Sequence, residues 1–418
     1  MTFVTSCEAV ILLLWYDKIH TMYDFSRAVN SVHSEDIKRL MRQSSGPGLI
    51  SFAGGMPNND LFPVSQIDEI YTGLSDELKK TCFQYGPTSG YPPLLKAVKE
   101  RLVRKGLPEE GNKLLITTGS LQAISIITQE FIDEGDVVLT ENPCFVGALS
   151  VFETYGAEVH AIPIDEHGIK IEALIHKIEN LAVKPKLLYL TPNFHNPAGI
   201  TYSMQRRKDL LKALHGRDII VLEDDAYSDL YFPDIDTDRV RPLKAHLGYD
   251  VDIIYTGSFS KILGPGFRLG YLYASPEIFD KAETVKQALD ACTSNFMQIL
   301  AAEFVTGGYL EPYLAFLRKE YQERKSLLQE ALVQHLPKEV LWTEPMGGFY
   351  FWLRLPQRLS STELFEICLQ KGVVFVTGRT FDPHNLIDNC LRLSFSNMPR
   401  KDIAPGVEIL ANAIREML

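Results

Sequence analysis

Clustered metal ligands and paired cysteines are missing from this sequence of 418 residues. Its six cysteines lie far apart, with no Cys-x-x-Cys pair, and its ten histidines form no His-x-x-x-His pattern. Such spacings argue against a disulfide framework and against a zinc motif. We therefore predict reduced thiols, a cytoplasmic location and no bound metal.

The sequence also lacks a basic tract, an internal repeat and a low-complexity segment. Its 42 lysines and arginines are outnumbered by 53 aspartates and glutamates, so the formal net charge is -11. Binding to a phosphate backbone needs clustered positive charge, which this composition does not offer. We expect no nucleic-acid partner.

A membrane-spanning run is missing as well. The apolar segment of residues 9–16 is too short to cross a bilayer, and the residues before Glu8 lack the Lys or Arg of a secretory signal. Two alternatives remain for this extension: it docks onto the protein, or the natural chain starts at Met22, after which the sequence reads as an ordinary beginning. We favour the start at Met22 and expect no membrane association.

What is present is an alternation of strand-like and helical segments, in a chain long enough for two or three domains. The strand-like runs are residues 114–117, 137–140, 158–162, 187–191, 219–223, 253–256 and 269–274. Helices are predicted at 67–80, 147–155, 171–178 and 203–214. The alternation indicates a parallel sheet covered on both faces. Beyond residue 275 the chain is mostly helical, with strands predicted within 341–353, at 373–376 and at 390–396.

Candidate site residues follow the carboxyl ends of these predicted strands. They are Ser120, Asn142, Phe145, Asn196, Asp224, Tyr227, Ser258 and Lys261. Ligands of parallel α/β sheets bind outside the carboxyl ends of the strands. This shared position supports a ligand site more strongly than any single motif does.

The stretch around Lys261 carries the most specific chemistry. Between two apolar runs lie Ser258, Ser260, Lys261, a Gly-Pro-Gly turn and Arg268. Desolvation lowers the pKa of a lysine, and the neutral amine attacks carbonyl groups. Hydroxyls and an arginine suit a phosphate dianion, so this combination suggests pyridoxal phosphate. An ordinary hairpin with an exposed Lys and Arg is the alternative for this stretch alone.

Several further motifs accompany it in an order typical of one family. They are Ala53-Gly54-Gly55-Met56-Pro57, Gln84-Tyr85-Gly86-Pro87-Thr88-Ser89-Gly90, Thr118-Gly119-Ser120, Thr191-Pro192-Asn193-Phe194-His195-Asn196-Pro197-Ala198-Gly199, Glu223-Asp224-Asp225-Ala226-Tyr227 and Arg392 in Leu391-Arg392-Leu393-Ser394. From about Val32 onward, the chain resembles the fold-type-I, class I/II aminotransferases that depend on pyridoxal phosphate. It is most similar to their branch of 2-aminoadipate and kynurenine aminotransferases.

The resemblance implies an α/β architecture, the type I fold of PLP-dependent transferases. Its large domain has three layers around a mostly parallel seven-stranded sheet, and its smaller domain is α+β. The expected divisions are an N-terminal extension at 1–22, an arm joining the small domain at 23–62, the large cofactor-binding domain at 63–300 and the small domain at 301–418. A homodimer with shared active sites is also implied, in which Tyr85 reaches the cofactor phosphate of the neighbouring subunit. On local evidence alone, Tyr85 fits a loop anchor equally well.

The same resemblance implies the catalytic roles. Lys261 would hold the cofactor aldehyde as a Schiff base and then move the proton between the substrate α-carbon and the cofactor. Asp224 would pair with the protonated pyridine nitrogen. Tyr227 and Asn196 would hydrogen-bond the phenolic oxygen and keep the imine pKa low, and Phe145 would stack on the ring.

Phosphate binding is implied for a set of hydroxyl, guanidinium and backbone N–H groups. The set comprises Gly119, Ser120, Leu121, Ser258, Ser260 and Arg268, together with Tyr85 from the neighbouring subunit. Leu121 departs from the family pattern, in which Gln is frequent. Its backbone N–H can still donate to a phosphate at the start of a helix.

Substrate recognition is expected at Gly55, Asn196, Arg392 and Lys38. Arg392 would clamp the α-carboxylate in a charge-assisted pair worth about 1.5–3 kcal/mol, which selects amino acids over simple amines. The aminoadipate branch often has an arginine in its first helix for a side-chain carboxylate. Here Lys38, followed by Arg39, stands in the comparable place, and lysine lacks the planar fork.

The implied reaction is a ping-pong transfer of the amino group of an L-amino acid to a 2-oxo acid such as 2-oxoglutarate. The donors expected are aromatic, branched or 2-aminoadipate-like. A PLP-dependent lyase would use the same lysine and is the first alternative. A non-catalytic ligand sensor, like the aminotransferase-like domains of some bacterial regulators, is the second. Too few residues precede Gly54 for the DNA-binding domain and linker of such a regulator.

Overall fold

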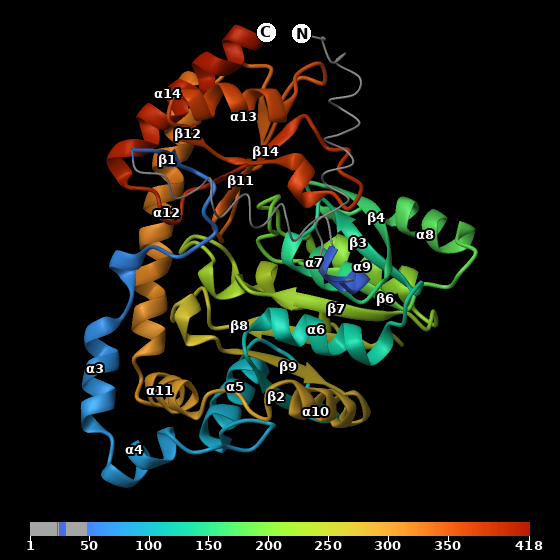
Figure 1. Ribbon diagram of the computed structural model, residues 1–418, viewed down its shortest axis with the longest axis vertical. Coiled ribbons are helices and arrows are strands. Elements are labelled where there is room, and N and C mark those ends of the chain that lie inside the picture. Colours follow the sequence, from blue (N-terminus) through green and yellow to red (C-terminus); the bar gives the residue numbers. More distant parts are fainter. Residues whose placement is uncertain (1–22, 24, 31–47) are drawn as a thin grey trace, which may run out of the picture.

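The computed structural model describes residues 23, 25–30 and 48–418 (Figure 1). The apolar segment at 9–16 and the candidate Lys38 lie outside the described residues. The main sheet has eight strands in the order β2-β9-β8-β7-β6-β3-β4-β5. These strands are β2 (Lys113–Thr117), β3 (Val137–Asn142), β4 (Glu158–Asp165), β5 (Gly168–Ile169), β6 (Leu187–Leu190), β7 (Ile220–Asp225), β8 (Ile253–Ser258) and β9 (Gly270–Ala274).

Most neighbouring strands of this sheet run parallel, as the alternating pattern predicts. β9 runs antiparallel to β2 and β8, and the two-residue β5 runs antiparallel to β4. The sheet has one strand more than expected, because the chain turns back after β4 and pairs Ile164 with Ile169.

Helices cover both faces of the main sheet. One face packs on α6 (Ser120–Phe131), α7 (Val146–Thr154) and α10 (Pro276–Asp290), and the other on α8 (Ile171–Asn180) and α9 (Met204–Leu214). Successive residues of β6 divide between the two cores: Tyr189 packs in the first, and Leu188 and Leu190 pack in the second. Successive side chains of a strand point to opposite faces, so a strand covered on both faces is apolar throughout.

A second, four-stranded sheet is antiparallel, with the order β10-β11-β14-β13. Its strands are β10 (Leu341–Trp342), β11 (Tyr350–Arg354), β13 (Val376–Thr377) and β14 (Cys390–Ser394). The helices in this part of the chain are α12 (Leu310–His335), α13 (Ser361–Gln370) and α14 (Arg400–Met417). Figure 1 shows α12 extending from this smaller sheet down to α11 (Asn295–Thr306), alongside the main sheet.

A short parallel pair joins the beginning of the described chain to its C-terminal part. β1 (Ile50–Ser51) pairs with β12 (Val373–Val374). Next to this pair, the Phe52 carbonyl accepts a hydrogen bond of 2.8 Å from the Ser394 N–H. The strand predicted at 373–376 is therefore split, because Val376 pairs with β14 instead of β1. The pairing fixes the segment that leads to Gly55 against the smaller sheet.

The single helix predicted at 67–80 is wrong, because the chain breaks it in two. The two helices are α3 (Val64–Gly73) and α4 (Asp76–Cys82). Leu74 is extended, and the Ser75 hydroxyl accepts a hydrogen bond of 3.2 Å from the Leu78 N–H. A serine in this position satisfies a free N–H of the first turn and starts a new helix.

The remaining elements of the described residues are α5 (Pro92–Arg104) and short 3-10 helices. The latter are η1 (Arg27–Asn30), η2 (Asn59–Leu61), η3 (Ser228–Leu230), η4 (Thr237–Val240), η5 (Leu243–Ala245), η6 (Pro265–Phe267) and η7 (Gly378–Phe381). Within the described ranges, no helix has both the length and the apolar character that a bilayer crossing requires.

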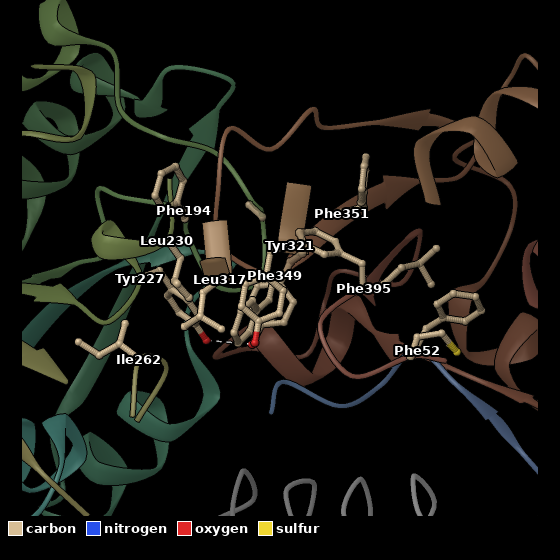
Figure 2. Close-up of a cluster of buried hydrophobic side chains, with 14 of the residues drawn as sticks. Phe52, Phe194, Tyr227, Leu230, Ile262, Leu317, Tyr321, Phe349, Phe351 and Phe395 are labelled. Carbon is tan, nitrogen blue, oxygen red and sulfur yellow. Dashed lines mark hydrogen bonds between the residues drawn. The ribbon is translucent and has the colours of Figure 1, made fainter. Parts of the chain in front are cut away.

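A buried apolar cluster joins the loop after β7 to α12 and the smaller sheet. Figure 2 shows Tyr227 and Leu230 from that loop beside Leu317 and Tyr321 of α12 and Phe349. Full burial of one large apolar side chain stabilises a protein by about 1.5–3 kcal/mol. The cluster thus fixes the loop after β7 relative to the smaller sheet.

Gly270, at the start of β9, lies against the start of α6. A Cβ atom there would be 2.6 Å from the Gly119 carbonyl carbon and from Ser120 N, which are backbone atoms. We predict that Gly270→Ala lowers the free energy of unfolding by roughly 1–3 kcal/mol, as overpacking does elsewhere. Thermal unfolding followed by circular dichroism measures the loss. Gly73→Ala is the control, since open space surrounds Gly73, and equal melting temperatures for both variants would contradict the prediction.

Candidate functional site

A cavity of about 300 Å³ lies at the carboxyl ends of the main-sheet strands, where the smaller sheet meets them. The predicted site residues that line it are Gly55, Gly119, Ser120, Leu121, Phe145, Asn196, Asp224, Tyr227, Ser258, Ser260, Lys261, Arg268 and Arg392. Two larger clefts, of about 800 and 750 Å³, have different linings. Convergent ionisable groups with perturbed pKa values, more than size, therefore mark this cavity as the candidate site.

Lys261 lies just beyond the end of β8, and its amine is held inside the cavity. Lys261 Nζ donates a hydrogen bond of 2.8 Å to the Gly55 carbonyl oxygen. Burial away from water lowers the pKa of Lys261 to about 8, and the positive charges of Arg392 and Arg268 act in the same direction. The negative charge of Asp224 opposes the shift. The neutral, nucleophilic form of this amine is therefore far more populated near neutral pH than in an ordinary lysine.

Asp224 is the last residue but one of β7 and is almost fully buried. Its Oδ2 accepts a hydrogen bond of 2.8 Å from the Tyr189 hydroxyl, whereas its Oδ1 has no partner. Burial raises the pKa of Asp224 to about 7, although the Tyr189 hydrogen bond works against the shift. A buried carboxylate oxygen without a donor is a position that a ligand N–H can fill.

An anion-binding corner forms where α6 begins. Gly119 precedes α6 with a φ of 86° and provides no side-chain cap, so the first N–H groups of the helix are free to bind a ligand. Arg268 is close by: a Cβ at Gly119 would lie 2.9 Å from its Nη2. Ser258 and Ser260 line the same cavity. Hydroxyls, a guanidinium and a helix N-terminus together suit a phosphate group.

Arg392 enters the cavity from β14 of the smaller sheet. Its Nη1 donates to Asn196 Oδ1 at 2.8 Å, and its Nη2 donates to the Ala53 carbonyl oxygen at 2.7 Å. Its Nε is buried without a partner. The guanidinium carbon lies 4.4 Å from the ring centroid of Tyr350 and 4.9 Å from that of Phe381. The guanidinium is thus held in place with hydrogen-bonding capacity remaining for a carboxylate.

The structure adds cavity residues that the sequence did not single out. They are Thr191, Ala226 and Tyr350. Tyr350 Oη lies 2.9 Å from Tyr227 Oη. Outside the cavity lining, the Tyr189 hydroxyl donates to Asp224. The sequence signal for Tyr350 was the Gly-Gly pair just before its aromatic strand. No sequence signal pointed to Tyr189, because a tyrosine within an apolar strand is interpreted as part of the hydrophobic core.

A buried network supports the loop that carries Asn196. Glu141 accepts hydrogen bonds of 2.7 Å from the Thr191 N–H and from the Tyr202 hydroxyl. His195 Nε2 lies 3.3 Å from Glu141 Oε2, and His195 Nδ1 accepts from the Ala198 N–H at 3.1 Å. Because its Nδ1 accepts a hydrogen bond, the neutral ring of His195 has its N–H at Nε2, which lies near Glu141 without forming a hydrogen bond. These contacts hold the segment on both sides of Asn196.

Tyr85 does not join the other candidates within one chain. It is 82% exposed, in the loop between α4 and α5, and is not part of the cavity lining. Lys38 lies outside the described residues.

Known proteins with similar sequences cover most of the chain. Residues 58–410 match the family model for aminotransferases of class I and II. The chain is 35% identical over 398 residues to aromatic-amino-acid aminotransferase 1 of Thermococcus litoralis, with 94% of each protein covered. It is 36% identical over 394 residues to the 2-aminoadipate transaminase of Thermus thermophilus, covering 94% of this chain and 97% of that enzyme.

The fold also closely matches that of a solved structure. A kynurenine aminotransferase of Pyrococcus horikoshii, crystallised in complex with PMP, gives a TM-score of 0.89 at 35% sequence identity. The match covers 97% of this chain and 99% of that one. The expected fold type is thereby confirmed, and the chain belongs to the class I and II aminotransferases.

Proposed function

We propose that this aminotransferase uses pyridoxal 5'-phosphate to move the amino group of an L-amino acid to a 2-oxo acid such as 2-oxoglutarate, in two half-reactions. The convergence of Lys261, Asp224 and Arg392 on one cavity carries the proposal. These groups supply a nucleophilic amine, an anion and a carboxylate clamp. An amino-acid aminotransferase needs all three around one bound cofactor and substrate.

The cavity residues fit pyridoxal phosphate in three respects. The unpartnered Asp224 Oδ1 can accept a hydrogen bond from a protonated ring nitrogen. The uncapped start of α6, with Arg268, can bind the phosphate dianion. Phe145 lines the cavity and offers an aromatic face to the ring. When bound, pyridoxal phosphate supplies an aldehyde that takes up the amino group and a ring that draws electrons from the substrate α-carbon.

Lys261 is the proposed nucleophile and proton carrier. Its lowered pKa, about 8, makes the neutral amine accessible, and the neutral Nζ can accept the proton of the substrate α-carbon and return it. Asp224 is the proposed anion for the ring nitrogen. Its pKa of about 7 would fall once a cation lies beside its free oxygen, so it would be ionised in the working site.

Arg392 is the proposed clamp for the substrate α-carboxylate. Asn196 and the Ala53 carbonyl hold two of its nitrogens, which fixes the plane of the guanidinium before the substrate arrives. A preorganised, partly desolvated guanidinium binds a carboxylate more strongly than a mobile one does. Donor choice then depends on the rest of the pocket. The names of the relatives given above support aromatic or 2-aminoadipate-like donors, and the branched donors stay a prediction.

We also propose that two copies of the chain share their active sites. The support is the outward position of Tyr85, which is 82% exposed on a loop rich in glycine and proline. Phe83, two residues earlier, is 78% exposed, and adjacent exposed aromatic residues suit a contact with another subunit. The cytoplasmic location predicted from the cysteines stays a prediction.

The proposal predicts formation of glutamate. Holoenzyme incubated with an amino donor and 2-oxoglutarate should yield glutamate. Lys261→Ala should abolish that yield, because Lys261 is the one lysine among the described residues that line the cavity. Chromatography of the products measures it. Lys244→Ala is the matched control: burial also lowers the pKa of Lys244 to about 8, but this residue lies outside the cavity.

Two results would overturn the proposal. Full activity of Lys261→Ala would remove the lysine from the reaction. Pyruvate released with ammonia, in the absence of glutamate, would indicate the lyase alternative.

Arg392→Gln removes the charge that meets the substrate carboxylate. We expect kcat/KM for amino acids to fall roughly 10- to 150-fold, the equivalent of one charge-assisted hydrogen bond. Steady-state kinetics measures the fall. Arg354→Gln, on the neighbouring β11 and outside the cavity, should leave kcat/KM unchanged. An equal loss in both variants would show that the effect is not the clamp.

The lowered pKa of Lys261 predicts how cofactor uptake by the apoprotein depends on pH. Protonated Nζ cannot attack an aldehyde, so the rate of covalent uptake should rise as the pH passes through about 8 and level off above it. Stopped-flow absorbance after mixing apoprotein with pyridoxal phosphate measures the rate. A rate that stays constant between about pH 6 and pH 9 would contradict the assignment. A group with a pKa of about 8 changes from mostly protonated to mostly neutral over that range.

A further inference from the structure

The hydroxyl groups of Tyr350 and Tyr227 meet at the wall of the cavity. Tyr350 begins β11, is 1% exposed, and places its Oη 2.9 Å from Tyr227 Oη. The two rings meet edge to face, with centroids 5.8 Å apart and planes at 76°. In the part of the chain that the structure describes, neither hydroxyl has another hydrogen-bond partner.

The backbone at Gly55 leaves room for this hydroxyl. A Cβ at Gly55 would lie 2.5 Å from Tyr350 Oη, so any side chain there would displace it. The same residue's carbonyl oxygen accepts the hydrogen bond from Lys261 Nζ. The Tyr350 hydroxyl is therefore fixed between Tyr227 and the backbone that holds the lysine.

Proton counting decides which hydroxyl donates. A tyrosine has one hydroxyl proton, and only one proton can lie between the two oxygens. If the Tyr227 hydroxyl donates its hydrogen bond to the ring oxygen of the cofactor, the hydrogen bond between the two tyrosines must be donated by Tyr350. An oxygen that accepts a hydrogen bond also becomes a stronger donor, because linked hydroxyls polarise one another.

We propose that Tyr350 is a positioning residue whose hydroxyl donates to Tyr227 Oη and thereby directs the Tyr227 proton to the ring oxygen of the cofactor. This inference rests on the proposed function. A hydrogen bond donated to the ring oxygen would weaken that oxygen's attraction for a proton on Lys261 Nζ. Tyr350 therefore helps to keep the pKa at that nitrogen low.

The ring of Tyr350 has a separate task from its hydroxyl. Its centroid lies 4.4 Å from the guanidinium carbon of Arg392, within the range of a cation–π contact. Phenylalanine keeps this ring and loses the hydroxyl, whereas leucine loses both. The two substitutions thus separate the effect on Tyr227 from the effect on the carboxylate clamp.

The test is a pH titration of the visible absorbance of bound pyridoxal phosphate in the holoenzyme. In Tyr350→Phe we expect the apparent pKa to rise by about 0.4–1 pH unit, the equivalent of one hydrogen bond, with the KM for amino acids changed less than about twofold. In Tyr350→Leu we expect the same rise together with a KM increase of roughly two- to fivefold, from the lost cation–π contact. Melting temperatures establish that the variants are folded.

Tyr321→Phe is the matched control. Tyr321 is fully buried in the same apolar cluster, with its ring centroid 4.8 Å from that of Phe349, but it does not line the cavity (Figure 2). Its loss of a hydroxyl should leave the titration unchanged. An equal rise in Tyr321→Phe would assign the effect to packing and overturn the inference.

An unchanged apparent pKa in Tyr350→Phe would also overturn it, because the Tyr350 hydroxyl would then have no effect on Tyr227. A lower apparent pKa would overturn it as well, because Tyr227 would then be the donor of the pair. Failure of the proposed function would look different. Wild-type protein would then show no cofactor absorbance that titrates, or no glutamate, whatever residue stands at position 350.

Discussion

Burial of charge at one end of the main sheet is the constraint on which the rest of the structure depends. Loss of water is the largest cause of both central pKa shifts, which bring Lys261 to about 8 and Asp224 to about 7. Buried ionisable groups are costly unless they have fixed partners. The partner of Lys261 is the Gly55 carbonyl, in the segment that follows β1. The partner of Asp224 is the Tyr189 hydroxyl, which comes from β6 of the main sheet.

Desolvation alone does not make a site. Lys244 is shifted to a similar pKa, also by burial, yet it donates to the Ile253 carbonyl oxygen and lines no cavity with Asp224 or Arg392. What distinguishes Lys261 is that a buried amine opens onto a space shared with an anion and a guanidinium. Parallel strands create that space, since their carboxyl ends and the loops after them meet at one edge.

The sequence was most informative where pattern and topology coincide. Continuous apolar runs such as that of β6 predict strands buried on both faces, and the motifs after them predict a shared edge, so the α/β fold and the residues that line the cavity were accessible without coordinates. The hydrogen-bond partners of the tyrosine hydroxyls could not be predicted in this way. Tyr189 and Tyr350 stand in apolar strands, where only the tertiary packing determines which group the hydroxyl meets. The break at Ser75 was missed because the helical periodicity continues across it, although serine is a common first cap.

The hydrogen bonds that the segment after β1 makes with distant residues have a consequence for how the protein folds during synthesis. The hydrogen bond from Arg392 to the Ala53 carbonyl joins residues separated by 339 positions, and the one from Lys261 to Gly55 joins residues separated by 206. Contacts of such long range form late, because a large loop must close first. A chain still emerging from the ribosome can therefore contain every strand of the main sheet. It cannot bind a carboxylate through Arg392 until β14 has left the exit tunnel.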